Sequence, residues 1–113
     1  MSDVEGIVRR TFEEPDESYP SDDGSVTRIV QVGDNMVMHS AMQPGWSWEE
    51  FVKPMAGEDS CPMDHREYIV SGRIRYRMDD GTETIGQAGD YLEIHPGHLA
   101  WVIGDEPCVT IDW

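Results

Sequence analysis

Three side chains that can bind a metal ion lie in the second half of the sequence: Cys61, His65 and His98. Cys61 and His65 are four residues apart where a strand region begins, and His98 directly follows the turn Pro96-Gly97. A thiolate with two imidazoles favours Zn, Fe, Ni or Cu over Mg or Ca, because soft sulfur and borderline nitrogen suit those ions. Three protein ligands leave one position open for water or a small molecule. Asp59 is a candidate fourth ligand, or a carboxylate that fixes the orientation of a histidine.

The elements that must position these residues are short strands. Residues 73–78 alternate arginine with Ile74, Tyr76 and Met78, which is the period-two pattern of a half-buried strand. Gly33-Asp34 and Asp79-Asp80-Gly81 are tight-turn signals between strands. Evenly spaced short strands without a helical period predict an all-β antiparallel sandwich or barrel. The expected strands cover residues 26–32, 36–42, 68–71, 73–78, 82–85, 91–94, 100–103 and 109–113.

The start of the chain differs from the rest in composition. Residues 1–24 are rich in acidic side chains, and Pro15 and Pro20 interrupt any regular element there. We therefore expect an acidic N-terminal arm over 1–24, with Phe12 among its few apolar anchors, and one domain over 25–113. The stretch 49–62 is expected to be a loop.

Glycine and turn residues within residues 57–104 resemble the two conserved motifs of the cupin superfamily. The resemblance is strongest to small single-domain members. Gly72 corresponds to the closing glycine of the first motif, and Gly89-Asp90 with Pro96-Gly97 to the frame of the second. The resemblance implies a cupin-type jelly-roll β-barrel and, by analogy, a homodimer. The metal ligands of the family are not present in this sequence. The positions that correspond to them hold Asp59, Cys61, His65 and Ala100, and the position of the family's proline in the second motif holds His95.

Inside such a barrel, Tyr68, Tyr76, Met78 and Trp101 are the candidate pocket-lining residues, with plain core packing as the alternative for each. Tyr68 is also a candidate acid/base group; no other catalytic residue is predicted. Glu67 and Glu93 are interpreted as solvated carboxylates. Trp46 and Trp48 follow a Pro-Gly turn and are expected to cover the barrel mouth or a subunit contact.

Charge narrows the classes of partner. The chain has 23 acidic and 8 basic residues and a net charge of −15, which argues against nucleic acid or an anionic membrane. No apolar run reaches the ~20 residues of a membrane span, so we expect a soluble, cytoplasmic protein. Cys108 is expected to be a small buried hydrophobe. The acidic, lysine-poor composition is typical of a source with high internal salt (a halophile) or of a GC-rich genome.

Three functions stay open at this point. The first is a metal-dependent enzyme acting on a small organic molecule, with the metal on Cys61, His65 and His98. The second is a non-catalytic sensor or storage module that binds a small ligand or metal, and the third is a barrel without a site that serves assembly. Cys61 can also be an ordinary thiol, and His65 and His98 can be imidazoles that only form hydrogen bonds. The sequence therefore does not decide among the three functions. No nucleophile–base pair is evident, so a hydrolase triad is disfavoured.

Overall fold

The computed structural model describes residues 6–113, and its regular elements are almost all strands. Two very short helices interrupt the region that was expected to be a loop. The elements are β1 (Glu17–Pro20), β2 (Val26–Val32), β3 (Asn35–Met42), α1 (Trp48–Phe51), α2 (Lys53–Ala56), β4 (His65–Ser71), β5 (Arg73–Met78), β6 (Glu83–Gln87), β7 (Tyr91–Ile94), β8 (His98–Ile103) and β9 (Cys108–Asp112). The all-β class predicted from the sequence is confirmed.

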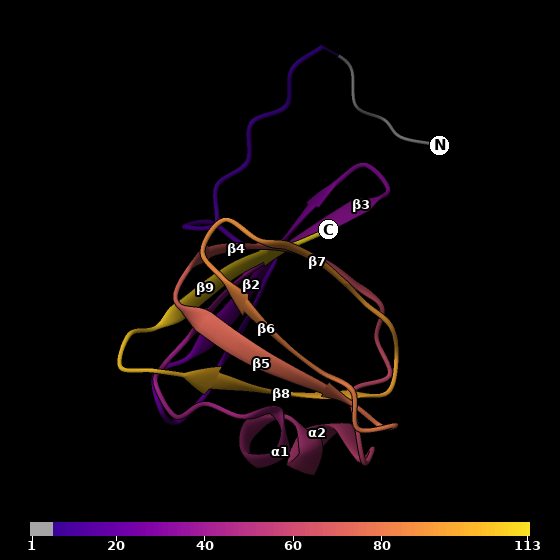
Figure 1. The fold of residues 1–113 in the computed structure, drawn as a ribbon. Coiled ribbons are helices and arrows are strands. Elements are labelled where there is room, and N and C mark those ends of the chain that lie inside the picture. Colours follow the sequence, from indigo (N-terminus) through magenta and orange to yellow (C-terminus); the bar gives the residue numbers. More distant parts are fainter. Residues whose placement is uncertain (1–5) are drawn as a thin grey trace.

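The strands form two antiparallel sheets (Figure 1). The larger has the order β1-β2-β3-β9-β4-β7, and the smaller has the order β6-β5-β8. Two isolated bridges, Ser47–Trp101 and Cys61–His98, join residues outside the strands to β8. Strand pairing does not connect the two sheets among the described residues, so the expected jelly roll takes the form of a two-sheet sandwich and not of a closed barrel.

Gly72 is where the chain passes from the larger sheet to the smaller one, between β4 and β5. Its φ angle of 80° lies in the left-handed region that favours glycine. A Cβ atom at this position would also overlap the backbone of Pro107 and Cys108. The glycine that resembles a cupin motif position thus has a physical role, since it allows the tight crossing from one sheet to the other.

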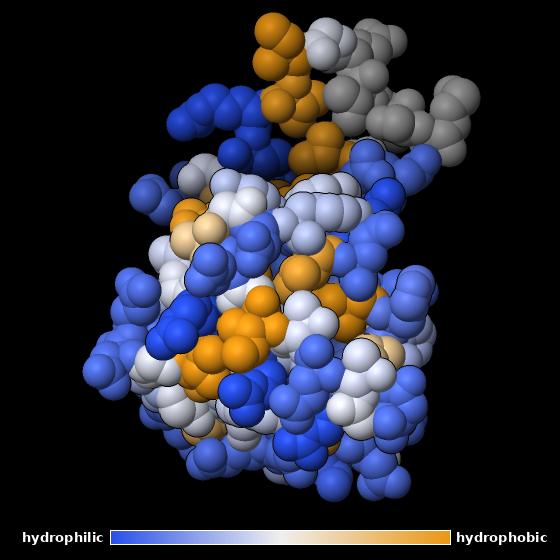
Figure 2. All heavy atoms as spheres, in the orientation of Figure 1, coloured by the Kyte–Doolittle hydropathy of each residue, from blue (hydrophilic) through white to orange (hydrophobic). Residues whose placement is uncertain are grey.

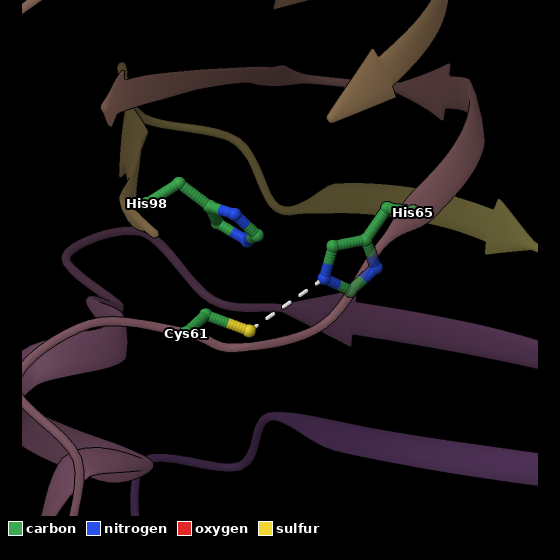
Figure 3. A group of neighbouring side chains, drawn as sticks. All are labelled: Cys61, His65 and His98. Atoms are coloured by element: carbon green, nitrogen blue, oxygen red, sulfur yellow. Dashed lines mark hydrogen bonds between the residues drawn. The ribbon is translucent and has the colours of Figure 1, made fainter. Parts of the chain in front are cut away.

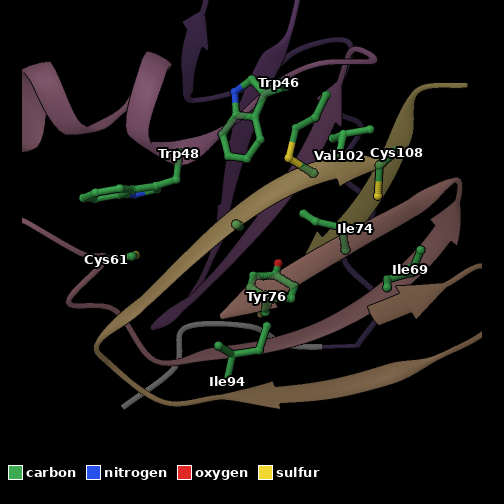
Figure 4. Packing of buried hydrophobic residues seen from close by; sticks show 11 residues of the cluster. Trp46, Trp48, Cys61, Ile69, Ile74, Tyr76, Ile94, Val102 and Cys108 are labelled. Atoms are coloured by element: carbon green, nitrogen blue, oxygen red, sulfur yellow. The ribbon is translucent and has the colours of Figure 1, made fainter. Parts of the chain in front are cut away.

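The core lies between the sheets (Figure 4). Alternate residues of β4, β5, β8 and β9 are buried, and β5 does so as its period-two pattern predicted. Ile69, Ile74 and Cys108 are completely or almost completely buried, which confirms the interpretation of Cys108. Trp46 and Trp48 are also buried in this cluster. The surface is mostly hydrophilic in the view of Figure 2, with hydrophobic residues gathered near the middle of this face and again at its top.

Part of the expected N-terminal arm belongs to the larger sheet, since β1 pairs with β2. Upstream of β1, the Phe12 ring lies 5.1 Å from the His39 ring, and Arg10 donates a hydrogen bond to the carbonyl of Gln31. Residues 1–5 of the expected arm lie outside the described residues. The division into an arm and a domain stays a prediction. None of the helices in the described part of the chain is long and apolar enough to cross a membrane.

Candidate metal centre

Three separate segments contribute to the candidate site. Cys61 follows α2 in a loop, His65 is the first residue of β4, and His98 is the first residue of β8. Backbone hydrogen bonds join two of these segments: the Cys61 N–H donates to the His98 carbonyl at 2.8 Å, and the Gly97 N–H donates to the Cys61 carbonyl at 2.7 Å. The turn Pro96-Gly97 therefore holds the cysteine loop against the start of β8, which the sequence did not indicate.

The three side chains point toward one another (Figure 3). Their ligand atoms all lie within 4.8 Å of one another, and the Cys61 Sγ lies 3.7 Å from Nε2 of His65. Cys61 and His98 are buried, and His65 is nearly so. The structure thus brings together all three residues singled out from the sequence.

Hydrogen bonds orient both imidazoles with Nε2 toward the cluster. The His98 Nδ1 lies 2.8 Å from the His95 carbonyl, and a carbonyl can only accept, so Nδ1 carries the proton. The His65 Nδ1 lies 2.7 Å from Oδ2 of Asp112 at the end of β9. In a neutral imidazole the other nitrogen then has a free lone pair. Metal-binding histidines commonly have such a partner on the second nitrogen.

The same contacts shift the acidities of Cys61 and His65. Burial alone would raise the pKa of the Cys61 thiol, but hydrogen bonds with His65 and His98 outweigh burial and lower the pKa to about 6. Burial would lower the pKa of His65, but Asp112 and the Cys61 sulfur raise it to about 10. Without a metal, a thiolate and an imidazolium therefore face each other at neutral pH. A metal ion bound here would displace the imidazolium proton.

A second buried group lies beside the cluster. The Tyr76 hydroxyl is 2.9 Å and 2.7 Å from the two carboxylate oxygens of Glu67, to which it donates. Glu67 pairs across the strands with Asp112. Burial and the nearby Asp112 charge raise the pKa of Glu67 to about 8. Burial and the Glu67 carboxylate also raise the pKa of Tyr76 well above its ordinary value.

Glu67 and Asp112 are functional residues that sequence reasoning missed. The interpretation of Glu67 as a solvated carboxylate is wrong, because Glu67 is buried. The alternation of residues along β4 could have indicated that Glu67 is buried. Its side chain is on the inward face of the strand together with those of His65 and Ile69. Asp112 follows the same rule on β9, two residues after the buried Thr110.

The cluster lies on the wall of a cavity of about 380 Å³. Of the four predicted pocket residues, Tyr76 lines this cavity. Tyr68 does not: it lies on the outward face of β4 and is exposed, so it cannot serve as an acid/base group for this cavity. Trp101 is on the outward face of β8, where the guanidinium carbons of Arg75 and Arg77 lie 5.7 Å and 5.0 Å from the ring centre.

The remaining predicted residues also have clear positions. Met78 is at the end of β5 and does not belong to the cavity lining found among the described residues. Asp59 is fully exposed and lies 3.9 Å from the Lys53 amine, so the structure does not bring it to the cluster. Asp112 has the orienting role that was considered for Asp59. Trp46 and Trp48 line the cavity from the core instead of covering it from outside.

Comparison with known proteins identifies the fold. No protein-family model and no curated protein matches the chain. A Klebsiella pneumoniae protein with a double-stranded β-helix domain is similar in structure, with a TM-score of 0.61, 22% identity, and coverage of 96% of this chain and 88% of the other. A cupin-like protein from Thermotoga maritima has a TM-score of 0.55 and 18% identity, and the match covers 96% and 79% of the two chains.

A third similar structure is a protein of unknown function (DUF1255) from Acidithiobacillus ferrooxidans. Its TM-score is 0.61 and its identity 20%, and the match covers 88% of this chain and 87% of the other. At these identities the likeness defines the fold alone. The chain has a cupin-like, double-stranded β-helix fold, and its chemistry has to be argued from its own residues.

Proposed function

We propose that this protein binds one divalent transition metal ion through Cys61, His65 and His98 and presents it to a small organic molecule in the adjoining cavity. The observation that carries the proposal is the convergence of three ligand atoms within 4.8 Å of one another on the cavity wall. A thiolate and two imidazoles suit Zn, Fe, Ni or Cu. The ion would supply Lewis-acid or oxygen-activating chemistry.

The hydrogen bonds of the site support this function. Asp112 accepts from Nδ1 of His65 and the His95 carbonyl accepts from Nδ1 of His98, so both Nε2 atoms remain for a metal. The low pKa of Cys61, about 6, favours the thiolate that a metal needs. With three ligands from the protein, the cavity side would stay open for the organic molecule.

Elemental analysis tests the metal. Tag-free wild type purified without chelator should contain about one Zn, Fe, Ni or Cu ion per chain. The Cys61→Ser/His65→Ala double variant should lose it, and His95→Ala should keep it, because His95 is exposed and outside the cluster. A wild type that takes up no metal even after incubation with these ions would contradict the proposal.

The same proteins separate an enzyme from a sensor or storage module. An enzyme would show turnover that disappears together with the metal in the double variant, while the circular dichroism spectrum stays that of wild type. A binding module would show ligand-induced thermal stabilisation without turnover.

A second candidate function uses the same cysteine as a nucleophile. Cys61, His65 and Asp112 form a connected thiol–imidazole–carboxylate series, with distances of 3.7 Å and 2.7 Å. This is the arrangement of an activated cysteine nucleophile, in which a histidine acts as base and a carboxylate orients it. The sequence analysis found no evident nucleophile–base pair, whereas the structure places the Cys61 Sγ 3.7 Å from Nε2 of His65.

His98→Ala distinguishes the two candidates. It removes one metal ligand and leaves Cys61, His65 and Asp112 in place. Under the metal function this variant should lose the metal and any turnover. Under the nucleophile function this variant should keep turnover without metal, and mass spectrometry should detect a covalent adduct of Cys61 with an ester or thioester substrate.

A further inference from the structure

Methionine and aromatic side chains are prominent in the cavity wall away from the cluster. Among the described residues, the cavity is lined by five of the chain's seven methionines: Met36, Met38, Met42, Met55 and Met63. Trp46, Trp48 and Phe51 add aromatic surface. Methionine is flexible and polarisable, so it adapts to apolar molecules of varied shape. This composition favours a ligand whose body is apolar.

The cavity also has an apolar rim. Tyr19, Met36, Met55 and Met63 line it, and each is an exposed large hydrophobic residue. In a chain with 23 acidic residues, an exposed group of apolar side chains is a feature that typically marks an interaction site. These residues also belong to the cavity lining, so the part of the wall that meets solvent includes apolar side chains.

Three hydroxyl groups on the wall already have hydrogen-bond partners in the protein. The Thr27 and Ser40 hydroxyls lie 2.9 Å apart, and the Ser25 hydroxyl donates to Asp23 at 2.9 Å. The metal cluster with Glu67 and Asp112 is the polar region that faces a ligand. The Asp112 carboxylate there, and the net charge of −15, oppose an anionic ligand.

We infer that the cavity binds a neutral, mostly apolar small molecule that carries a single uncharged polar head, such as a medium-chain alcohol or an aromatic equivalent. The apolar body lies against the methionine wall, and the head points toward Cys61, His65 and His98. The inference rests on the proposed function only for the orientation of the ligand, because the polar head is the part that would reach the metal.

Competition with a neutral fluorescent probe tests the inference. N-phenyl-1-naphthylamine should bind wild type and be displaced by 1-butanol, 1-hexanol and 1-octanol. Each added methylene should tighten binding about fourfold until the cavity is filled. In the metal-free Cys61→Ser/His65→Ala variant, octanoate should need a concentration about tenfold higher than 1-octanol, because its charge must leave water and no cation is there to bind it. Affinity that does not depend on chain length, or a probe that does not bind, would overturn the inference.

A matched pair of variants places the binding in this cavity. Met63→Glu puts a charge on the rim and should weaken 1-octanol binding about tenfold or more. Ile85→Glu is the control, because Ile85 is 46% exposed, close to the 43% of Met63, but lies on β6 away from the cavity. Equal effects of the two variants would sink the assignment of the site.

Metal content measured on the same samples keeps the two proposals apart. If the Cys61→Ser/His65→Ala variant lacks metal but still binds 1-octanol with the same chain-length dependence, the apolar site exists independently of the metal. If wild type holds a metal but shows no such dependence, the metal site survives and the inference about the ligand fails.

Discussion

His65 and Asp112 lie 47 residues apart in the sequence, and their side chains meet at 2.7 Å between Nδ1 and Oδ2. The contact ties the first residue of β4 to the last residue of β9, its neighbour in the larger sheet. It directs Nε2 of His65 toward Cys61. The position of a candidate metal ligand is therefore set by a strand pairing, and the orientation of the His65 ring can be changed by a substitution at Asp112.

Asp112→Asn tests this dependence. Asparagine keeps an acceptor for the His65 Nδ1–H but removes the negative charge that strengthens the imidazole as a ligand. We expect metal affinity to fall about 10- to 100-fold with the fold unchanged. Competition with a chromophoric chelator measures the affinity. Asp64→Asn is the control, because Asp64 faces the exposed His95 at 3.5 Å in a pair outside the cluster; an equal loss there would contradict the role of Asp112.

Glu67 makes stability depend on pH in a direction opposite to that of most carboxylates. Its pKa is raised from 4.5 to about 8 in the folded protein, so the folded state binds a proton more tightly than the unfolded state. The free energy of unfolding should therefore fall as the pH rises from about 4.5 to about 8.

Glu67→Gln should remove this fall, because glutamine stays neutral and still accepts from the Tyr76 hydroxyl. Urea unfolding of metal-free wild type and variant at pH 5, 7 and 9 measures the difference. The variant should gain on wild type as the pH increases. Parallel pH profiles would show that Glu67 is not neutralised in the folded protein.

The sequence predicted the fold class and the three donors of the site because both depend on local signals. Strand alternation and turn glycines are visible in short windows, and Cys61, His65 and His98 are rare residue types next to such turns. The strands at His65 and His98 begin earlier than predicted, so both histidines belong to regular elements.

The parts that the sequence did not predict depend on contacts between distant segments. Asp112 reaches His65 only through the β4–β9 pairing, and Glu67 is buried only because its face of β4 meets the smaller sheet. Tyr68 was placed in the pocket because it is aromatic and close to His65. An odd offset along a strand, however, puts it on the opposite face.

The homodimer remains a prediction, and the larger sheet offers a face for it. Tyr68 and Val70 on β4, Tyr91 on β7 and the terminal Trp113 are exposed apolar or aromatic side chains, and the Tyr91 and Trp113 rings lie 6.0 Å apart. Sedimentation equilibrium should show a dimer that Tyr68→Glu weakens, because the substitution places a charge in an apolar contact. Ile85→Glu on the other sheet should leave the association unchanged, and a wild type that is monomeric at high concentration would contradict the prediction.

The two cysteines should titrate far apart in the metal-free protein. Hydrogen bonds with His65 and His98 lower the pKa of Cys61 to about 6, whereas burial and the charges of Glu67 and Glu106 raise that of Cys108 to about 12. Thiolate absorbance at 240 nm should therefore show one step near pH 6, lost in Cys61→Ser and moved to higher pH in His65→Ala. Cys108→Ala should retain the step. A first thiolate step above pH 8 in metal-free wild type would mean that His65 does not hold the Cys61 thiolate, and the connected series of Cys61, His65 and Asp112 would then have no chemical consequence.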